Sequence, residues 1–139
     1  MHLTITPGRR ISEVQHDFNT VFPFLKLEFF HSRSFSPTAF TAANRVSLDR
    51  KLGELQQPVP ENEIEIGEDM IVKDLEKMFR DRFNLAVQVF RKSGNLWLET
   101  TMTDNWTLRQ QNNHGEELST IRVKRLKPGN DEPGREADL

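Results

Sequence analysis

An internal repeat is the feature of this sequence that most constrains its fold. Leu3-Thr4-Ile5 aligns with Ile64-Glu65-Ile66, and the same offset of 61 residues continues without a gap through the segment that follows. In this alignment four further apolar positions coincide: Ile11 with Val72, Val14 with Leu75, Phe18 with Phe79, and Phe22 with Phe83. Two amphipathic helices matched by chance would not also align a strand, so the sequence indicates two copies of one structural unit.

Each copy has the pattern of a strand, a helix and a hairpin. The last three aligned pairs are spaced four residues apart, which places them on one face of a helix. Alternating segments over 25–29 and 85–90 follow the helices and are predicted to be strands. In the second copy a turn over 92–95 leads to a strand over 96–100, which predicts a hairpin. In the first copy Pro37 interrupts the corresponding segment, so its hairpin is expected to be irregular or at a sheet edge.

A short polar helix is predicted to close each copy. At an offset of 60, Ser47-Leu48 aligns with Thr107-Leu108, and each pair opens a segment that runs toward a glycine, Gly53 or Gly115. A glycine is expected just past the last turn of a helix. Thr107 and Gln110 also have the spacing of a capping box.

The sequence therefore predicts an α+β fold of two tandem βαββα units, over 1–57 and 62–118. Because a unit of this size buries little surface alone, the two are expected to share one mixed sheet and one core around a pseudo-twofold axis. Each strand–helix–strand step is expected to be a right-handed crossover between parallel strands, with a ferredoxin-like double βαβ layout as the closest familiar arrangement. Residues 119–126 are predicted to form a final edge strand that completes a single domain over 1–126, and 127–139 a disordered tail.

The segments 11–30 and 72–85 resemble those of small uncharacterised bacterial α+β proteins. The shared pattern is a helix that ends at Phe, an aromatic-rich strand, a hairpin, and a short helix opened by Thr-Leu. The resemblance covers most of residues 1–118 and implies a folding pattern. It implies no activity, ligand or catalytic residue.

Composition narrows the class of protein further. Ten Phe and two Trp without any Tyr predict a Phe-rich core, and the absence of Cys excludes disulfides, thiolate nucleophiles and cysteine-bound metals. A net charge of −2 gives no general attraction to nucleic acid or anionic membranes. The segment MHLTITPGRR has no apolar core of a signal peptide, and no run is long enough to span a membrane. We therefore expect a cytoplasmic protein without membrane partners.

The titratable residues form no recognisable catalytic or metal-binding pattern. His2, His16, His31 and His114 do not occur in HxH, HxxxH or HExxH spacing, and the glycines form no phosphate-binding loop. Acidic residues near the start of the second helix have a sufficient explanation in the helix dipole. The sequence thus predicts a protein that is not an enzyme and that needs no cofactor.

Aromatic residues with nearby arginines are the best candidates for a binding surface. Alternation in Leu96-Trp97-Leu98 places the tryptophan and the leucines on opposite faces of the strand, so one of the two sets faces solvent or a second layer. The candidate partner-binding residues are Trp97, Phe35, Phe40, Arg33, Arg45 and Arg91. Either these residues form the centre of an interface, or the other repeat covers the aromatics as core.

These candidates predict a non-catalytic interaction or assembly module that binds a protein partner or a second copy of itself. The alternative is a weak single-stranded nucleic-acid binder, with bases stacked on aromatic side chains of the sheet and basic groups at 91–92 and 122–127. Nucleic acid is the less favoured partner, because the chain has no RNP-like run and the acidic tail opposes the basic segment.

Overall fold

A computed structural model describes residues 1–31, 41–55 and 59–125, with the side chains of 121–125 outside that description. The chain is α+β, as the sequence predicts. Its elements, in order, are β1 (His2–Ile5), α1 (Ile11–Val21), β2 (Leu25–Phe30), the 3-10 turn η2 (Ala42–Asn44), α2 (Leu52–Leu55), β3 (Asn62–Glu65), α3 (Val72–Phe83), β4 (Ala86–Ser93), β5 (Leu96–Glu99), the 3-10 turn η3 (Thr101–Thr103) and α4 (Leu108–Arg125).

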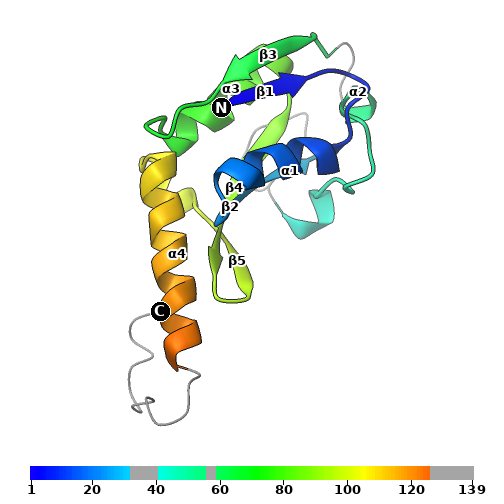
Figure 1. Ribbon diagram of the computed structural model, residues 1–139. Helices are drawn as coiled ribbons and strands as arrows, with labels where there is room; N and C mark the ends of the chain where they lie inside the picture. The colour runs from blue at the N-terminus through cyan, green and yellow to red at the C-terminus, as the bar shows by residue number, and fades with distance from the viewer. Residues whose placement is uncertain (32–40, 56–58, 126–139) are drawn as a thin grey trace.

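The described strands form two antiparallel sheets, so the prediction of one mixed sheet is wrong. One sheet has the order β1-β3 and the other the order β2-β4-β5 (Figure 1). Each strand–helix–strand step carries the chain from the first sheet to the second, and β1 never becomes a parallel neighbour of β2. The strands pair across the two repeats instead of within each repeat, with the β4–β5 hairpin as the exception.

The pairing register shows the predicted pseudo-twofold axis. Leu3 pairs with Ile64, which is its own equivalent in the other repeat, and Glu28 pairs with Gln88 in the same way at an offset of 60. Antiparallel partners that are each other's equivalents lie on a twofold axis, so the axis passes through both sheets. The offset falls from 61 to 60 between the helices and the strands that follow them. Two residues separate Phe22 from Leu25, whereas one residue, Asn84 in a left-handed helix cap, separates Phe83 from the equivalent Leu85.

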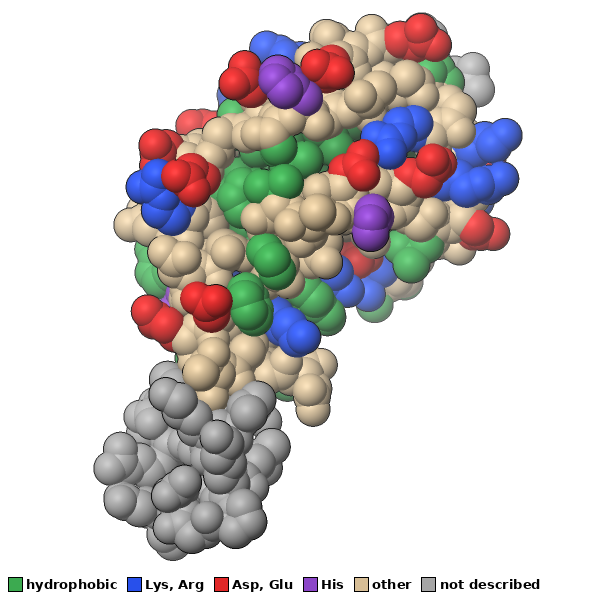
Figure 2. Space-filling model, in the orientation of Figure 1, with side chains coloured by type: hydrophobic (Ala, Val, Ile, Leu, Met, Phe, Trp, Pro, Cys, Tyr) green, Lys and Arg blue, Asp and Glu red, His purple; other side chains and the backbone are tan. Residues whose placement is uncertain are grey.

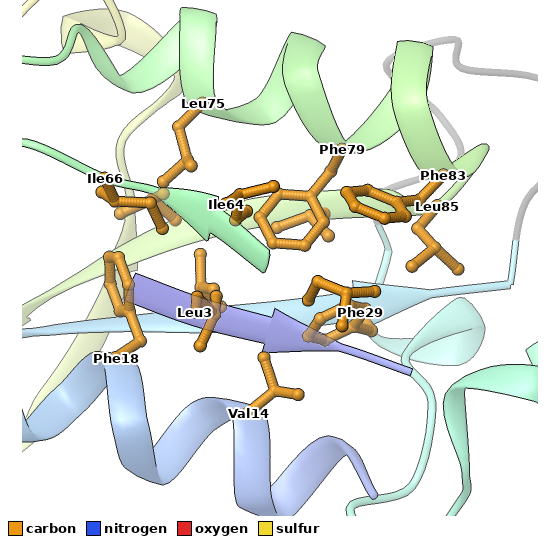
Figure 3. Packing of buried hydrophobic residues seen from close by; sticks show 14 of the residues in the cluster. Leu3, Val14, Phe18, Phe29, Ile64, Ile66, Leu75, Phe79, Phe83 and Leu85 are labelled. Carbon is orange, nitrogen blue, oxygen red and sulfur yellow. The ribbon is translucent and has the colours of Figure 1, made fainter. Parts of the chain in front are cut away.

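The core is rich in phenylalanine, and the helix register predicted from the repeat is confirmed. Val14, Phe18 and Phe22 of α1 are buried, and so are Leu75, Phe79 and Phe83 of α3. Figure 3 shows α1 and α3 on opposite sides of the strands, with Val14 and Phe18 reaching in from α1 and Phe79 from α3. The rings of Phe29 and Phe79 meet edge to face at 5.9 Å, so β2 of one repeat packs on α3 of the other.

The helices α2 and α4 begin at equivalent positions, but the sequence alignment of these two starts is wrong by four residues. Leu52 donates its backbone N–H to Arg9, and Leu108 donates its own to Met70 in the same manner. Leu52 and Leu108 are fully buried, whereas Leu48 is half exposed. Ser47-Leu48 is therefore not the match for Thr107-Leu108. The match is Lys51-Leu52, because Leu52 is the residue that is buried. Local spacing in the sequence does not show which leucine is buried.

The helix α4 corrects two further predictions. It passes through Gly115, which is therefore not a helix end, and it continues to Arg125, so the predicted strand over 119–126 is helical in its described part. The buried positions Leu108, Gln111, Gly115 and Leu118 form one helical face on the sheet. Four alternating residues at 121–124 fit a helix turn as well as a strand, and no breaker separates them from α4. Residues 127–139 lie outside the described ranges.

The capping box predicted at the start of α4 is present. The Thr107 backbone N–H donates to Gln110 Oε1 at 2.9 Å, and the Gln110 N–H donates to Thr107 Oγ1 at 3.1 Å. These two backbone N–H groups have no partner within the helix, so the side-chain acceptors stabilise its first turn.

Truncating the equivalent phenylalanines should destabilise the protein equally. Phe18→Ala and Phe79→Ala each leave a cavity in the shared core, and we expect each to lower the free energy of unfolding by about 3–5 kcal/mol. Urea melts measure this, with the exposed Val21→Ala on α1 as the control, expected within about 0.5 kcal/mol of the wild type. A loss below about 1 kcal/mol for both variants would contradict the interlocked core.

Gly115 should not tolerate alanine, although alanine usually stabilises a helix interior by about 0.5–1 kcal/mol. A Cβ at this position would lie 2.8 Å from Phe24 Cβ and 3.2 Å from the Lys92 carbonyl oxygen. We expect Gly115→Ala to cost about 1–3 kcal/mol in a urea melt, because α4 has to move away from the sheet. Gly8→Ala, whose Cβ would meet nothing within 4 Å, is the control. Unchanged or increased stability of Gly115→Ala would show that α4 does not pack this closely.

Candidate functional site

The second face of the three-stranded sheet carries its own small apolar cluster. Leu25, Leu27 and Phe29 of β2 point into the main core, so the alternate side chains of the sheet point the other way. On this second face Phe30, Ala86 and Phe90 are buried together, and Trp97 of β5 packs against them while it stays partly exposed. The predicted binding residue Trp97 is therefore an anchor of the hairpin as well as a surface residue.

A buried carboxylate organises the charges of this face. Glu28 is nearly inaccessible, and its side-chain oxygens lie 3.3 Å from Lys26 Nζ and 3.1 Å from Arg45 Nε. The same two cations stand over aromatic rings, with Lys26 Nζ 4.8 Å from the Trp97 centroid and Arg45 Cζ 5.4 Å from that of Phe90. Arg45, another predicted binding residue, is thus held by intramolecular contacts.

Arg91 lies on the opposite face of the sheet from Trp97. Its Nη1 donates to Gln111 Oε1 at 2.9 Å, and Gln111 Nε2 donates to the carbonyl and hydroxyl oxygens of Thr103, both at 2.7 Å. Burial lowers the pKa of the Arg91 guanidinium from its usual value. This chain of hydrogen bonds ties β4, α4 and the turn η3 together.

The structure describes three of the six predicted binding residues and separates them into two groups. Trp97 and Arg45 share the second face of the sheet, and Arg91 lies on the other face. Arg33, Phe35 and Phe40 lie outside the described residues.

Sequence reasoning missed a group of exposed apolar side chains that lie close together in the chain. Leu96 and Leu98 of β5 are 61% and 40% exposed, and Met102 in η3 is 94% exposed. Alternation separates the leucines from Trp97 but cannot tell which set faces solvent. The two residues of each hairpin pair share a face of the sheet: Lys92 stands opposite Trp97, and Arg91 stands opposite Leu98. The hairpin register could therefore have been used to assign the leucines to the face that carries Arg91.

A two-residue turn holds these leucines in place. Gly94 and Asn95 join the strands, and Gly94 has a φ of 61°, the conformation that a glycine provides at the first position of a type II′ turn. Thr100, just after β5, donates its hydroxyl to the Val89 carbonyl at 2.8 Å. Both ends of β5 are therefore fixed to β4.

A shallow pocket of about 280 Å³ lies beside Trp97. Its wall combines the apolar Trp97 and Leu48 with polar side chains of α1 and with Lys26. The α1 side chains Gln15 and Asn19 donate to the carbonyls of Leu27 and Leu25, so they are occupied with covering the edge of β2.

Glu76 is a partly buried carboxylate at the position equivalent to Gln15. Its Oε2 accepts the backbone N–H of Val89 at 3.0 Å, so both equivalent side chains bind the strand of their own repeat. Burial raises the pKa of Glu76 to about 7, the Val89 hydrogen bond opposes this, and nearby Asp104 adds to it. Glu76 therefore titrates near neutral pH.

Within the described ranges, no group of three His, Asp or Glu side chains is placed to hold a metal ion. The described helices include none that is long and apolar enough to cross a membrane. Figure 2 shows acidic and basic side chains interspersed over the visible face, with hydrophobic side chains gathered beside α4. Of the aromatic side chains on the three-stranded sheet, Phe30 and Phe90 are buried and Phe29 lies in the main core, whereas Trp97 stays partly exposed.

Comparison with models of protein families, with curated proteins and with solved structures finds no match to this chain.

Replacing Glu76 with Gln should flatten the pH dependence of stability. The folded-state pKa of about 7 lies above the ordinary 4.5, so the stability associated with this group is present below about pH 4.5 and is lost as the pH rises through 7. We compare the free energy of unfolding of Glu76→Gln with that of the wild type at two pH values. The difference in favour of the variant is expected to be about 1–3 kcal/mol larger at pH 8 than at pH 5. Glutamine has a side-chain carbonyl oxygen that can still accept the Val89 N–H, so the substitution removes the titrating group and keeps the acceptor.

Denaturant melts at both pH values measure this effect, and Glu116→Gln, which changes an exposed carboxylate of α4, is the control. Parallel pH profiles for the wild type and Glu76→Gln would contradict the assignment.

Proposed function

We propose that this protein acts as a non-catalytic interaction module. The proposed contact surface is the face of the β4–β5 hairpin that carries Leu96 and Leu98, and it binds a partner protein. The observation that carries the proposal is the exposure of Leu96, Leu98 and Met102 within one short stretch of the chain. Leu96 and Leu98 are two residues apart on a strand, so they lie side by side on one face. Exposed apolar side chains that adjoin one another are typical of interaction sites, whereas single ones are ordinary.

The rigidity of the hairpin supports this role. Trp97 packs on the Phe30 and Phe90 cluster from one face, and the pairing with β4 holds the backbone. The turn η3 that follows is fixed by Gln111 and by the Gln88 amide, which donates to Thr101 Oγ1 at 2.7 Å. A surface that is ordered before binding loses little conformational entropy when the partner binds.

The proposed contact surface differs in part from the one expected from sequence. Trp97 contributes mainly by fixing the hairpin, while its leucine neighbours on the other face supply the exposed apolar area. Arg91 lies opposite Leu98 across the hairpin, so this predicted arginine adjoins the exposed leucines. A contribution from Phe35 and Phe40 remains an expectation from sequence.

Polar replacement of the leucines should abolish binding without unfolding the protein. We expect Leu96→Ser/Leu98→Ser to weaken partner binding by about 30-fold or more, because burial of two leucines is lost, while the melting temperature changes little. The measurement is a pull-down from the native host with the tagged chain, followed by titration of the captured protein. Val21→Ser, at a residue that is 47% exposed on α1, is the matched control. Equal capture by the double variant would place the binding surface elsewhere.

A further inference from the structure

The edge of β5 is open for pairing within the part of the chain that the structure describes. The sheet order β2-β4-β5 leaves β5 bonded to β4 on one side only. In a hairpin with a two-residue loop, the closing pair, here Ser93 and Leu96, exchanges backbone hydrogen bonds, and the bonded pairs then alternate. Leu96 and Leu98 therefore bond to β4, whereas the N–H and C=O groups of Trp97 and Glu99 point outward.

The strand lacks the usual protection of an edge. Natural proteins block exposed edges with a proline, a β-bulge or a charged residue directed into the pairing surface. The β5 sequence Leu-Trp-Leu-Glu has no proline, and its pairing with β4 continues through all four residues without a bulge. Its single charge, Glu99, stands at one end.

The same four residues are complementary to themselves in an antiparallel arrangement. When Trp97 pairs with Trp97 of a second copy, Leu96 falls opposite the copy's Leu98, and Leu98 opposite the copy's Leu96. Antiparallel partners point to the same face, so the exposed leucines of both chains form one apolar patch. Glu99 falls opposite the uncharged Asn95 of the loop, so the two copies place no like charges opposite each other.

We propose that two copies of this chain associate through β5, forming a continuous antiparallel sheet around a twofold axis at Trp97. This inference rests on the proposed function and names the partner as a second copy. The pairing is isologous: the same strand serves both subunits, so the assembly closes as a dimer. It satisfies the outward N–H and C=O groups of Trp97 and removes from water the leucines that the single chain leaves exposed.

Cysteine cross-linking tests the register directly, because the chain contains no native cysteine. Leu96 and the copy's Leu98 would form a non-hydrogen-bonded pair, with Cα atoms about 4.5 Å apart, within the range of about 4.4–6.8 Å that a disulfide spans. Leu96→Cys and Leu98→Cys are prepared separately and then mixed under mild oxidation. We expect a disulfide dimer from the mixture and at most a trace from either variant alone.

Sedimentation equilibrium of the unmodified chain supplies the second measurement. We expect the mean mass to rise toward that of a dimer with concentration, and Glu99→Pro to weaken the association at least tenfold because it removes an outward N–H. Glu99→Ala, which keeps that N–H, is the matched control, and Leu98→Lys should also abolish the dimer while Leu48→Lys should not.

A chain that stays monomeric at all concentrations would overturn the inference, and so would a dimer that neither cross-links in the mixture nor responds to Glu99→Pro. Monomeric behaviour together with leucine-dependent capture of a host protein would leave the proposed function standing. Monomeric behaviour without such capture would remove both.

Discussion

The pairing of each strand with the other repeat is the constraint on which the rest of the structure depends. β1 bonds to β3, and β2 bonds to β4, so neither repeat contains a sheet that is complete without its partner. The helices follow from this arrangement: the Phe79 ring of α3 packs on Phe29 of the first repeat, and both helices enclose one core. Because a unit of this size buries a small fraction of its surface alone, interlocking adds the buried surface of a full domain.

The repeat could be predicted from sequence because burial imposes the same apolar register on both copies. Val14, Phe18 and their equivalents Leu75 and Phe79 are buried as the pattern indicates, and α3 spans the aligned apolar positions from Val72 to Phe83. The pairing of strands could not be predicted, since an alternating segment looks the same whichever strand it bonds to. The end of α4 was missed for a related reason: Gly115 is small because Phe24 and Lys92 lie against it, and not because a helix ends there.

The candidate site was predictable to a smaller extent. The spacing of Leu96-Trp97-Leu98 separated two faces, and contacts with Phe30 and Phe90 decide that the tryptophan is the one held against the sheet. Glu28 forms ion pairs with Lys26 of β2 and with Arg45, which lies outside the strand, so no local sequence motif predicts the two contacts together. The raised pKa of Glu76 likewise arises from burial by other elements, with Asp104 as a smaller contribution.

The differences between the two repeats are the basis of the binding surface that we propose. The symmetric positions, such as Leu3 and Ile64 or Phe18 and Phe79, serve the shared core and are buried in both copies. The second repeat adds features for which the first has no described counterpart: a regular hairpin with exposed leucines, and a helix α4 of 18 residues where α2 has 4. The core does not require exposed leucines on β5. Since symmetry accounts for the core and not for the hairpin, the hairpin is where we propose that a partner binds.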